Sequence, residues 1–245
     1  MEMASKEAIL ANYHRVVEQI DQATRSVGRR PEEIKLVVVT KGHPYPVLHQ
    51  AIEVGLRIFG ENYTEEGIAK IQACPKQAEM EWHMIGHIQS RKASSVCEYF
   101  NWVHSLDSLK LANRLDRFAG ELSRKLPVLL ECNMSGEETK YGWPAWEKRM
   151  WGGLLDEIAK IVALPNLEVR GLMTMAPFLP APEESRPYFQ RLYHLQEFLK
   201  ESFPQTTWNE LSMGMSVDFM VAIQEGATQV RIGTAIMGSR SDHPK

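Results

Sequence analysis

The stretch Leu36–Pro44, which reads LVVVTKGHP, carries the clearest strand signal in the chain. Its first five residues are apolar or β-branched at successive positions, which is typical of a strand buried on both faces in a parallel sheet. Lys41 and a Gly-His-Pro segment end the run at once. We therefore expect a buried parallel strand with a lysine at its carboxyl end.

The same unit recurs along the whole chain. Seven further strand-like segments lie at 57–59, 81–85, 102–106, 127–132, 167–172, 208–211 and 229–232. Helical patterns separate them, at 46–54, 61–73, 89–99, 108–124, 145–162, 182–203 and 217–225. Eight strands alternating with helices predict a single α/β domain over 1–245, a (β/α)₈ TIM barrel. The rival fold is an open doubly wound sheet, but no GxGxxG follows the first strand.

An additional amphipathic helix is predicted at 3–27, before the first strand. Almost nothing follows the last strand, so we expect this helix to cover the barrel where a final helix would sit. From its length we expect one barrel and, after Arg240, no second domain.

The composition is that of a soluble cytoplasmic protein. The 245 residues carry 28 Lys+Arg and 31 Asp+Glu, a net charge of −3 that gives no general attraction to nucleic acid or a membrane surface. No apolar run approaches the ~18–20 residues of a membrane span, and no secretory signal is present. Cys74, Cys97 and Cys132 have no metal-binding spacing and are expected to be reduced thiols.

Lys41 is the sharpest single candidate for chemistry. A lysine leaving a buried strand loses hydration, which lowers the pKa of the amine toward the nucleophilic form that Schiff-base chemistry needs. The plainer interpretation is a strand-end lysine whose ammonium reaches solvent. Taken alone, Lys41 favours the plainer interpretation.

Two segments near the C-terminus favour phosphate binding. Leu211–Asp218 reads LSMGMSVD and is followed by Val230–Thr234, VRIGT. Loops after the seventh and eighth strands, with a short extra helix, form the usual phosphate site of TIM barrels. Ser216 is a candidate N-cap of the helix at 217–225, and Gly233 with Thr234 opens a short helix. The alternative is that the two segments are ordinary helix N-caps with glycines that serve only the turns.

Other polar residues carry weaker signals. Arg231 lies in a buried run and needs a partner, either a carboxylate on a neighbouring strand or a ligand. The histidines lack metal-ligand spacing and are interpreted as core or loop residues, and no metal site is predicted: His43, His83, His87 and His104. Met173 and Met175 are interpreted as barrel packing.

Taken together, seven motifs in order resemble the pyridoxal 5′-phosphate (PLP) homeostasis protein family, from about residue 35 to residue 240. They are VVVTK at 37–41, FGENY at 59–63, WHMIGHIQ at 82–89, HSLD at 104–107, RGLMTMAP at 170–177, LSMGMS at 211–216 and VRIGT at 230–234. Each motif is weak alone, whereas the ordered set is specific. The resemblance implies a barrel like the N-terminal domain of alanine racemase, with PLP held as a Schiff base.

The resemblance also implies roles for individual residues. Lys41 matches the Schiff-base lysine, and Arg231 matches the arginine that approaches the pyridine nitrogen. The phosphate-binding segment is matched by Ser212 and Ser216, with Gly233 and Thr234 adding backbone donors, while Asn62 and His83 match residues near the cofactor. Three places depart from the usual family pattern: Gly42-His43, Arg91 and Trp143.

The function that the resemblance implies is PLP carriage and buffering, which maintains vitamin B6 and amino-acid and keto-acid homeostasis without catalytic residues. An arginine beside the pyridine nitrogen disfavours protonation of that nitrogen and weakens carbanion chemistry. PLP-dependent apo-enzymes are the expected recipients, and a monomer or weak dimer is expected. The alternatives are an active PLP-dependent racemase or lyase, and a barrel that binds another phosphorylated metabolite.

Overall fold

The structure is a closed parallel barrel, as the alternating pattern predicts. The computed structural model describes residues 4–75 and 79–239. Its eight barrel strands are β1 (Lys35–Val39), β2 (Ile58–Glu61), β3 (Glu81–Met84), β4 (Trp102–Leu106), β5 (Leu126–Asn133), β7 (Leu167–Met173), β8 (Glu210–Ser212) and β9 (Gln229–Ile232). Neighbouring strands pair in parallel around the ring, and β4 pairs with β5 to close it. The open-sheet alternative is therefore wrong.

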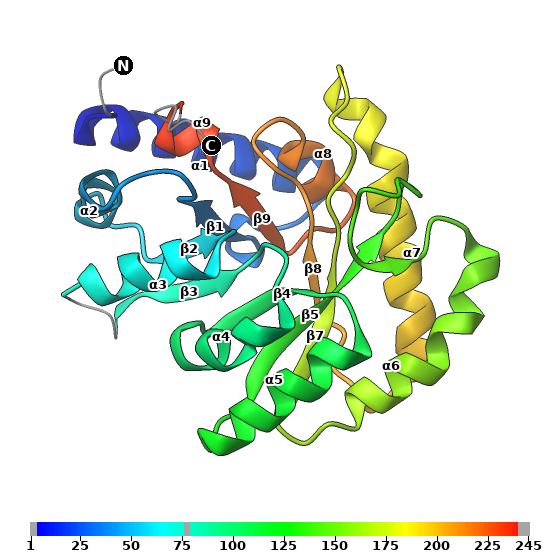
Figure 1. Ribbon diagram of the computed structural model, residues 1–245. Coiled ribbons are helices and arrows are strands. Elements are labelled where there is room, and N and C mark those ends of the chain that lie inside the picture. Colours follow the sequence, from blue (N-terminus) through cyan, green and yellow to red (C-terminus); the bar gives the residue numbers. More distant parts are fainter. Residues whose placement is uncertain (1–3, 76–78, 240–245) are drawn as a thin grey trace.

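Helices surround the strands on the outside of the ring (Figure 1). They are α1 (Lys6–Ser26), α2 (Tyr45–Glu53), α3 (Thr64–Ala73), α4 (Ala93–Tyr99), α5 (Leu109–Glu121), α6 (Leu155–Val162), α7 (Arg186–Ser202), α8 (Phe219–Gln224) and α9 (Thr234–Met237). Helix α1 packs against α2, α8 and α9, so the N-terminal helix fills the gap beside the last strand as expected. Met3, the predicted first residue of this helix, lies outside the described residues.

The interior has two distinct parts. A continuous apolar layer lies between strands and helices, with large side chains such as Phe59, Trp82 and Phe189 fully buried. The barrel lumen contains both apolar and polar side chains. Val37 and Ile85 are buried in the lumen and are not part of the outer apolar layer, and the buried polar side chains beside them include His83 and His104. Burial of apolar surface stabilises the outer layer, while buried polar groups in the lumen require hydrogen-bond partners.

Gly171 marks an irregular place in the barrel wall. The register of β5 and β7 shifts between Val128 and Leu129, and Gly171 adopts φ = +156° opposite this shift. A Cβ atom on Gly171 would lie 1.8 Å from the carbonyl oxygen of Glu210 on β8. Only glycine allows the two strands to approach this closely.

Two local features differ from the sequence expectation. A two-residue strand, β6 (Trp143–Pro144), pairs with the end of β5, and the Trp143 Nε1–H donates to Glu157 Oε2 at 3.1 Å. Helix α8 begins at Phe219 rather than at residue 217, with Asp218 as its N-cap residue. Ser216 is therefore not the cap of α8, and its role is described below.

Two expectations from the sequence concern the thiols and the lengths of the apolar segments. Cys74, Cys97 and Cys132 are buried free thiols. Across residues 4–75 and 79–239, none of the helices has the length and apolar character needed to cross a membrane.

Candidate functional site

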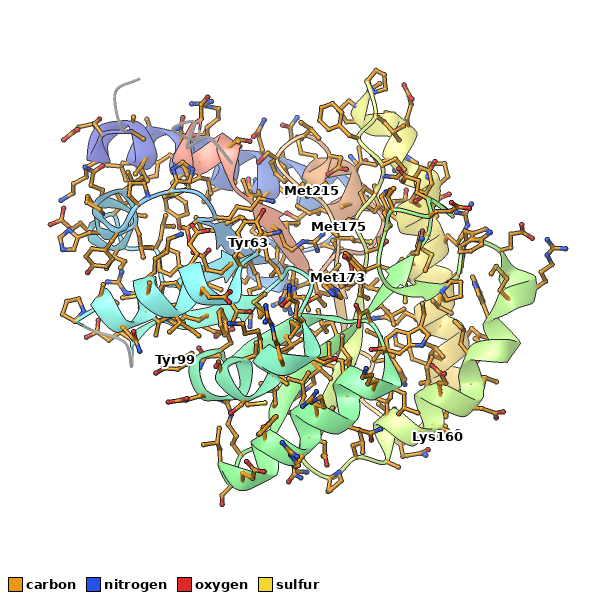
Figure 2. All side chains as sticks on the ribbon, in the orientation of Figure 1. Tyr63, Tyr99, Lys160, Met173, Met175 and Met215 are labelled. Carbon is orange, nitrogen blue, oxygen red and sulfur yellow. The ribbon has the colours of Figure 1, made fainter. Side chains whose placement is uncertain are left out.

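A pocket of about 250 Å³ opens at the carboxyl ends of the strands. Its walls come from β1, β2, β3, β7, β8 and β9, or from the loops that follow them, which is where active groups of TIM barrels gather. The lining residues are Val39, Lys41, Asn62, Ile85, Met175, Phe178, Met215, Ser216, Val217, Arg231, Gly233 and Thr234. The labelled Met175 and Met215 lie close together in Figure 2, over the side of the barrel formed by β7 to β9.

One side of this pocket is a cradle of backbone donors, formed by Ser216, Val217, Gly233 and Thr234. All four residues line the pocket, and in the described part of the chain their N–H groups donate to no other group. Two of them follow β8 and two lie at the start of α9. Unpaired N–H groups that converge on a pocket are the arrangement that binds phosphate.

Neighbouring residues fix the shape of this cradle. The Ala235 N–H donates to Ser216 Oγ at 3.3 Å, which joins the β8 loop to α9. The Asp218 carboxylate accepts from the Met215 N–H at 2.7 Å. Gly214 has φ = +92°, and a Cβ atom there would lie 2.6 Å from the Ala222 Cβ. Glycine is therefore required where this loop passes close to α8.

Lys41 also lines the pocket, two residues after β1 ends at Val39. Its backbone is held on both sides by Lys70 and Glu66 of α3. The Lys70 ammonium donates to the Thr40 carbonyl at 2.6 Å and to Glu66 at 2.7 Å, and the Gly42 N–H donates to the same Glu66 oxygen at 2.6 Å. Gly42 has φ = +72°, so the departure Gly42-His43 supplies a glycine where the turn needs one.

The support beneath Lys41 is a buried ion pair. Lys70 also donates to Glu61 at 2.8 Å, and the Thr40 hydroxyl donates to the same Glu61 oxygen. Glu61 is fully buried and Lys70 is 5% exposed. Burial raises the pKa of Glu61, and the Lys70 charge opposes that rise. The sequence interpretation missed Lys70, although Glu66 and Lys70 share one helix face at a spacing of four residues.

Arg231 lines the base of the pocket and its partners are neutral. Its guanidinium donates to Ser212 Oγ at 2.6 Å and to the Thr174 carbonyl at 2.8 Å. Burial lowers the pKa of Arg231 to about 10, which leaves the group charged at neutral pH. From the sequence, the partner of Arg231 was expected to be a carboxylate on a neighbouring strand or a ligand. In the structure a hydroxyl and a carbonyl accept its hydrogen bonds instead of a carboxylate. A charged guanidinium, fixed by neutral hydrogen-bond partners, therefore faces the pocket.

The structure places the expected site residues in two groups. Six line the pocket: Lys41, Asn62, Ser216, Arg231, Gly233 and Thr234. The other two, His83 and Ser212, are fully buried in the lumen behind Arg231 and line no part of this pocket. Ser212 Oγ contacts Arg231 and His104 there, so its hydroxyl is engaged away from the cradle.

Other lining residues carried little or no signal in the sequence. Met175, which was interpreted as packing, forms part of the wall, whereas Met173 is buried as expected. Val217 contributes a backbone N–H that no side-chain motif reveals. Phe178 is 88% exposed and stands at the mouth, so the pocket opens to solvent beside an aromatic ring.

Comparison with known proteins assigns the class of this barrel. Residues 8–241 match the model of the alanine racemase N-terminal domain family. Alanine racemase of Clostridium difficile 630 superposes with a TM-score of 0.70 at 17% identity, over 94% of this chain and 56% of the racemase. At that identity the likeness extends to the fold alone.

Closer relatives narrow the class. The pyridoxal phosphate homeostasis protein of Escherichia coli strain K12 is 40% identical over 242 residues, which are 95% of this chain and 97% of that protein. The homeostasis protein of Vibrio alginolyticus is also 40% identical, over 95% of this chain and 98% of that protein. PipY of Synechococcus elongatus PCC7942, solved with PLP bound, is 35% identical with a TM-score of 0.77, over 89% of this chain and 100% of PipY. This chain belongs to the pyridoxal phosphate homeostasis protein family.

Proposed function

We propose that this protein binds PLP as a Schiff base on Lys41 and carries it in reserve for PLP-dependent enzymes. The observation that carries the proposal is the pairing, in one pocket, of a lysine with a cradle of unpaired backbone N–H groups. PLP has an aldehyde and a phosphate at separate places on its ring, and these two features match them. The PLP-bound structure of PipY supports the same assignment.

The pocket residues fit the remaining parts of PLP. Asn62 Oδ1 is buried without a hydrogen-bond partner in the described chain, which makes it available to a polar ligand group. Val39 and Ile85 supply apolar walls for an aromatic ring, and Arg231 supplies a fixed cation. When bound, PLP would supply a reactive aldehyde with which the Lys41 amine condenses, releasing water.

We further propose little or no turnover of amino acids. Racemisation requires an acid or base on each face of the substrate carbon. Among the described lining residues, Lys41 is the one side chain that could serve as an acid or base, since Arg231 stays charged and Asp, Glu, His and Tyr are missing from the wall. A fixed cation beside the ring also disfavours protonation of a ring nitrogen, which weakens electron withdrawal.

This part of the proposal is tested by hydrogen exchange in heavy water. The PLP-loaded protein is incubated with a panel of L-amino acids, and deuterium at Cα is measured by mass spectrometry. We expect no incorporation above that given by free PLP at the same concentration. Incorporation at a catalytic rate would establish a racemase or lyase instead, and a known racemase serves as the positive control.

The phosphate cradle predicts strong discrimination between PLP and pyridoxal, which lacks the phosphate. A hydrogen bond to a charged group contributes about 1.5–3 kcal/mol, and several donors converge here. We expect pyridoxal to bind at least about 100-fold more weakly than PLP, measured by absorbance titration at one pH and salt concentration. Equal affinities would show that the cradle does not hold phosphate. Binding of other phosphorylated metabolites with no preference for PLP would favour the alternative of a barrel that binds another phosphorylated metabolite.

The mouth of the pocket bears on the release of PLP to other enzymes. The mouth of the pocket carries the exposed side chains of Phe178 and Val217, so a bound PLP would have a short path to solvent. PLP-dependent apo-enzymes are the proposed recipients, from a monomer or weak dimer. Buried free thiols support a cytoplasmic location.

A further inference from the structure

A chain of hydrogen bonds runs through the lumen away from Arg231. Arg231 Nη1 donates to Ser212 Oγ at 2.6 Å, and Ser212 Oγ lies 2.9 Å from Nδ1 of His104. His104 Nε2 in turn lies 2.7 Å from Nδ1 of His83. All four side chains are buried and belong to four different strands, so the chain crosses the barrel interior.

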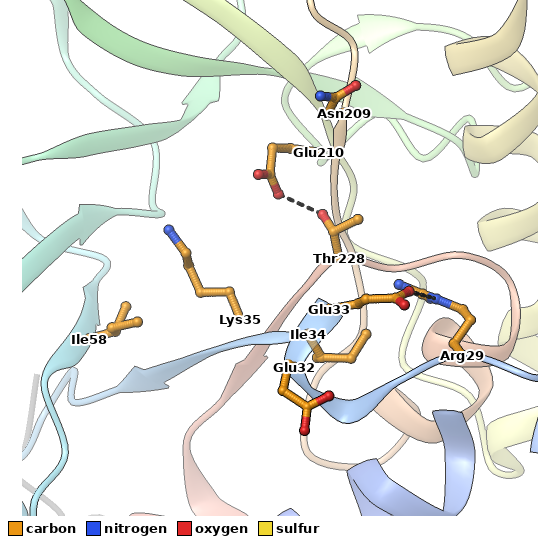
Figure 3. Close-up of a pocket in the computed structure, with 9 residues that line it drawn as sticks. All are labelled: Arg29, Glu32, Glu33, Ile34, Lys35, Ile58, Asn209, Glu210 and Thr228. Carbon is orange, nitrogen blue, oxygen red and sulfur yellow. Dashed lines mark hydrogen bonds and ion pairs between the residues drawn. The ribbon is translucent and has the colours of Figure 1, made fainter. Parts of the chain in front are cut away.

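The chain ends at the opposite mouth of the barrel. His83 Nε2 lies 2.7 Å from Glu81 Oε1, and the same oxygen accepts from Lys35 Nζ at 2.8 Å. Lys35 lines an opening of about 580 Å³ at the amino ends of the strands, where Glu210 and Thr228 lie across from it (Figure 3). The chain therefore connects a solvent-accessible mouth to the base of the proposed PLP pocket.

When both histidine rings are neutral, the chemistry of the two ends fixes the direction of every bond between them. Arginine can only donate, and an ionised carboxylate can only accept. His83 must then donate from Nε2 to Glu81 and accept at Nδ1. By the same logic His104 donates from Nε2 and accepts at Nδ1 from the Ser212 hydroxyl. In this arrangement every donor points toward Glu81, and both rings are Nε2–H tautomers.

The surroundings agree with neutral rings and an ionised carboxylate. Burial lowers the pKa of His104 well below its usual value, and the positive charges of Arg231 and Lys35 lower it further. Burial also lowers the pKa of His83, against the opposing effect of Glu81. The hydrogen bond from His83, assisted by Lys35, lowers the pKa of Glu81 to about 2.

Three further carboxyl groups act on these hydrogen-bonded side chains. Glu210 of β8 raises the pKa of His83, while Asp218, the N-cap residue of α8, and Glu131 of β5 raise that of Arg231. Among the described residues none of the three forms a hydrogen bond with Arg231, Ser212, His104 or His83, so none interrupts the series. Aligned hydrogen bonds of this kind polarise one another in a low dielectric.

We propose that Ser212, His104 and His83 form a directional relay that holds Arg231 in place and couples the proposed PLP pocket to the charge of Glu81 at the far mouth. They act as positioning residues through Arg231. The coupling to PLP rests on the proposed function, whereas the relay itself is a property of the protein without ligand.

The relay is tested first in the protein without PLP. Long-range proton–nitrogen NMR distinguishes the two neutral tautomers from the imidazolium. We expect His83 and His104 to be neutral Nε2–H tautomers throughout pH 6 to 8, with the exposed His87 as the reference signal. An imidazolium or an Nδ1–H tautomer at either ring would overturn the relay, whatever the protein binds.

The coupling is tested with Glu81→Gln. The glutamine oxygen can still accept from His83, so the shape is kept while the charge is lost. Without ligand, the side-chain N–H signals of His104 and Arg231 should shift. In the loaded protein we expect a displaced visible band and PLP affinity changed by about 3- to 30-fold.

Glu168→Gln is the matched control, because Glu168 lies on β7 in a half-exposed pair with Arg170 and takes no part in the hydrogen-bonded series from Arg231 to Glu81. Unchanged His104 and Arg231 signals in Glu81→Gln, or equal shifts in Glu168→Gln, would contradict the coupling. A wild-type protein that binds no PLP would refute the proposed function, and the NMR arms would still decide the relay.

Discussion

Replacing Lys41 by alanine is expected to abolish the visible absorbance band of the protein mixed with PLP. The same change should remove the covalent pyridoxyl label that borohydride fixes. Both effects follow because the Lys41 amine is the proposed bond to the aldehyde, and no other lysine is among the described residues that line the pocket. The measurements are an absorbance spectrum before and after reduction and the intact mass of the reduced protein.

Lys140→Ala is the matched control for this prediction. Lys140 Nζ donates to the carbonyl of Met175, a pocket-wall residue, at 3.2 Å, so this lysine is close to the site without lining it. The control should keep the band and the label. The Lys41 variant should remain folded, because Thr40 and Gly42 are held by Lys70 and Glu66 independently of the Lys41 side chain. An unchanged band in Lys41→Ala would refute the assignment.

Lys70→Met is expected to give the largest loss of stability. It removes the cation from Glu61, which is fully buried, and leaves an uncompensated carboxylate in the barrel wall. Breaking a buried pair in this way costs about 3 kcal/mol or more. For a chain of this length such a loss lowers Tm by about 10 °C. The measurement is chemical and thermal unfolding followed by circular dichroism.

The loss should depend on pH in a defined direction. Burial raises the folded-state pKa of Glu61, and without Lys70 the hydrogen bond from the Thr40 hydroxyl remains as an interaction that opposes this rise. When the pKa of a carboxyl group is higher in the folded state than in the unfolded state, the protein loses stability as the pH rises from the lower value to the higher one. The deficit of Lys70→Met should therefore be larger at pH 8 than at pH 5.

Lys92→Met provides the comparison, since Lys92 forms an exposed pair with Glu65 of the same helix that carries Lys70. Exposed pairs contribute about 0–1 kcal/mol. Similar deficits in the two variants, or a Lys70→Met deficit that grows toward acid pH, would contradict the buried-pair interpretation. PLP binding should weaken in Lys70→Met alone, because Lys70 holds the Thr40 carbonyl beside Lys41.

The fold could be predicted because each barrel strand carries its own local signal. Runs such as Leu36–Thr40 and the helices between them repeat often enough to identify the architecture without any long-range information. The start of α8 was predicted two residues too early. Ser216 is a good capping residue by type, but Asp218 occupies the cap position and Ser216 Oγ accepts from Ala235 instead.

The candidate site was predictable where it consists of strand-exit residues. Lys41, Arg231 and the glycine-containing loops follow strands directly, so barrel geometry brings them to one mouth. The lumen was not predictable in this way. His104 meets Ser212 across 108 positions of sequence, and this contact depends on the register of strands that are not sequence neighbours. The hydrogen-bonded chain behind Arg231 therefore emerges only from the closed barrel.

The bond between PLP and Lys41 can be tested most directly by peptide mapping of the wild-type protein after PLP loading and borohydride reduction. We expect one dominant pyridoxyl-phosphate adduct, located on Lys41, whose formation is suppressed by excess inorganic phosphate competing for the cradle. A reduced protein without an adduct, or with its dominant adduct on another lysine such as Lys140, would refute the bond to Lys41.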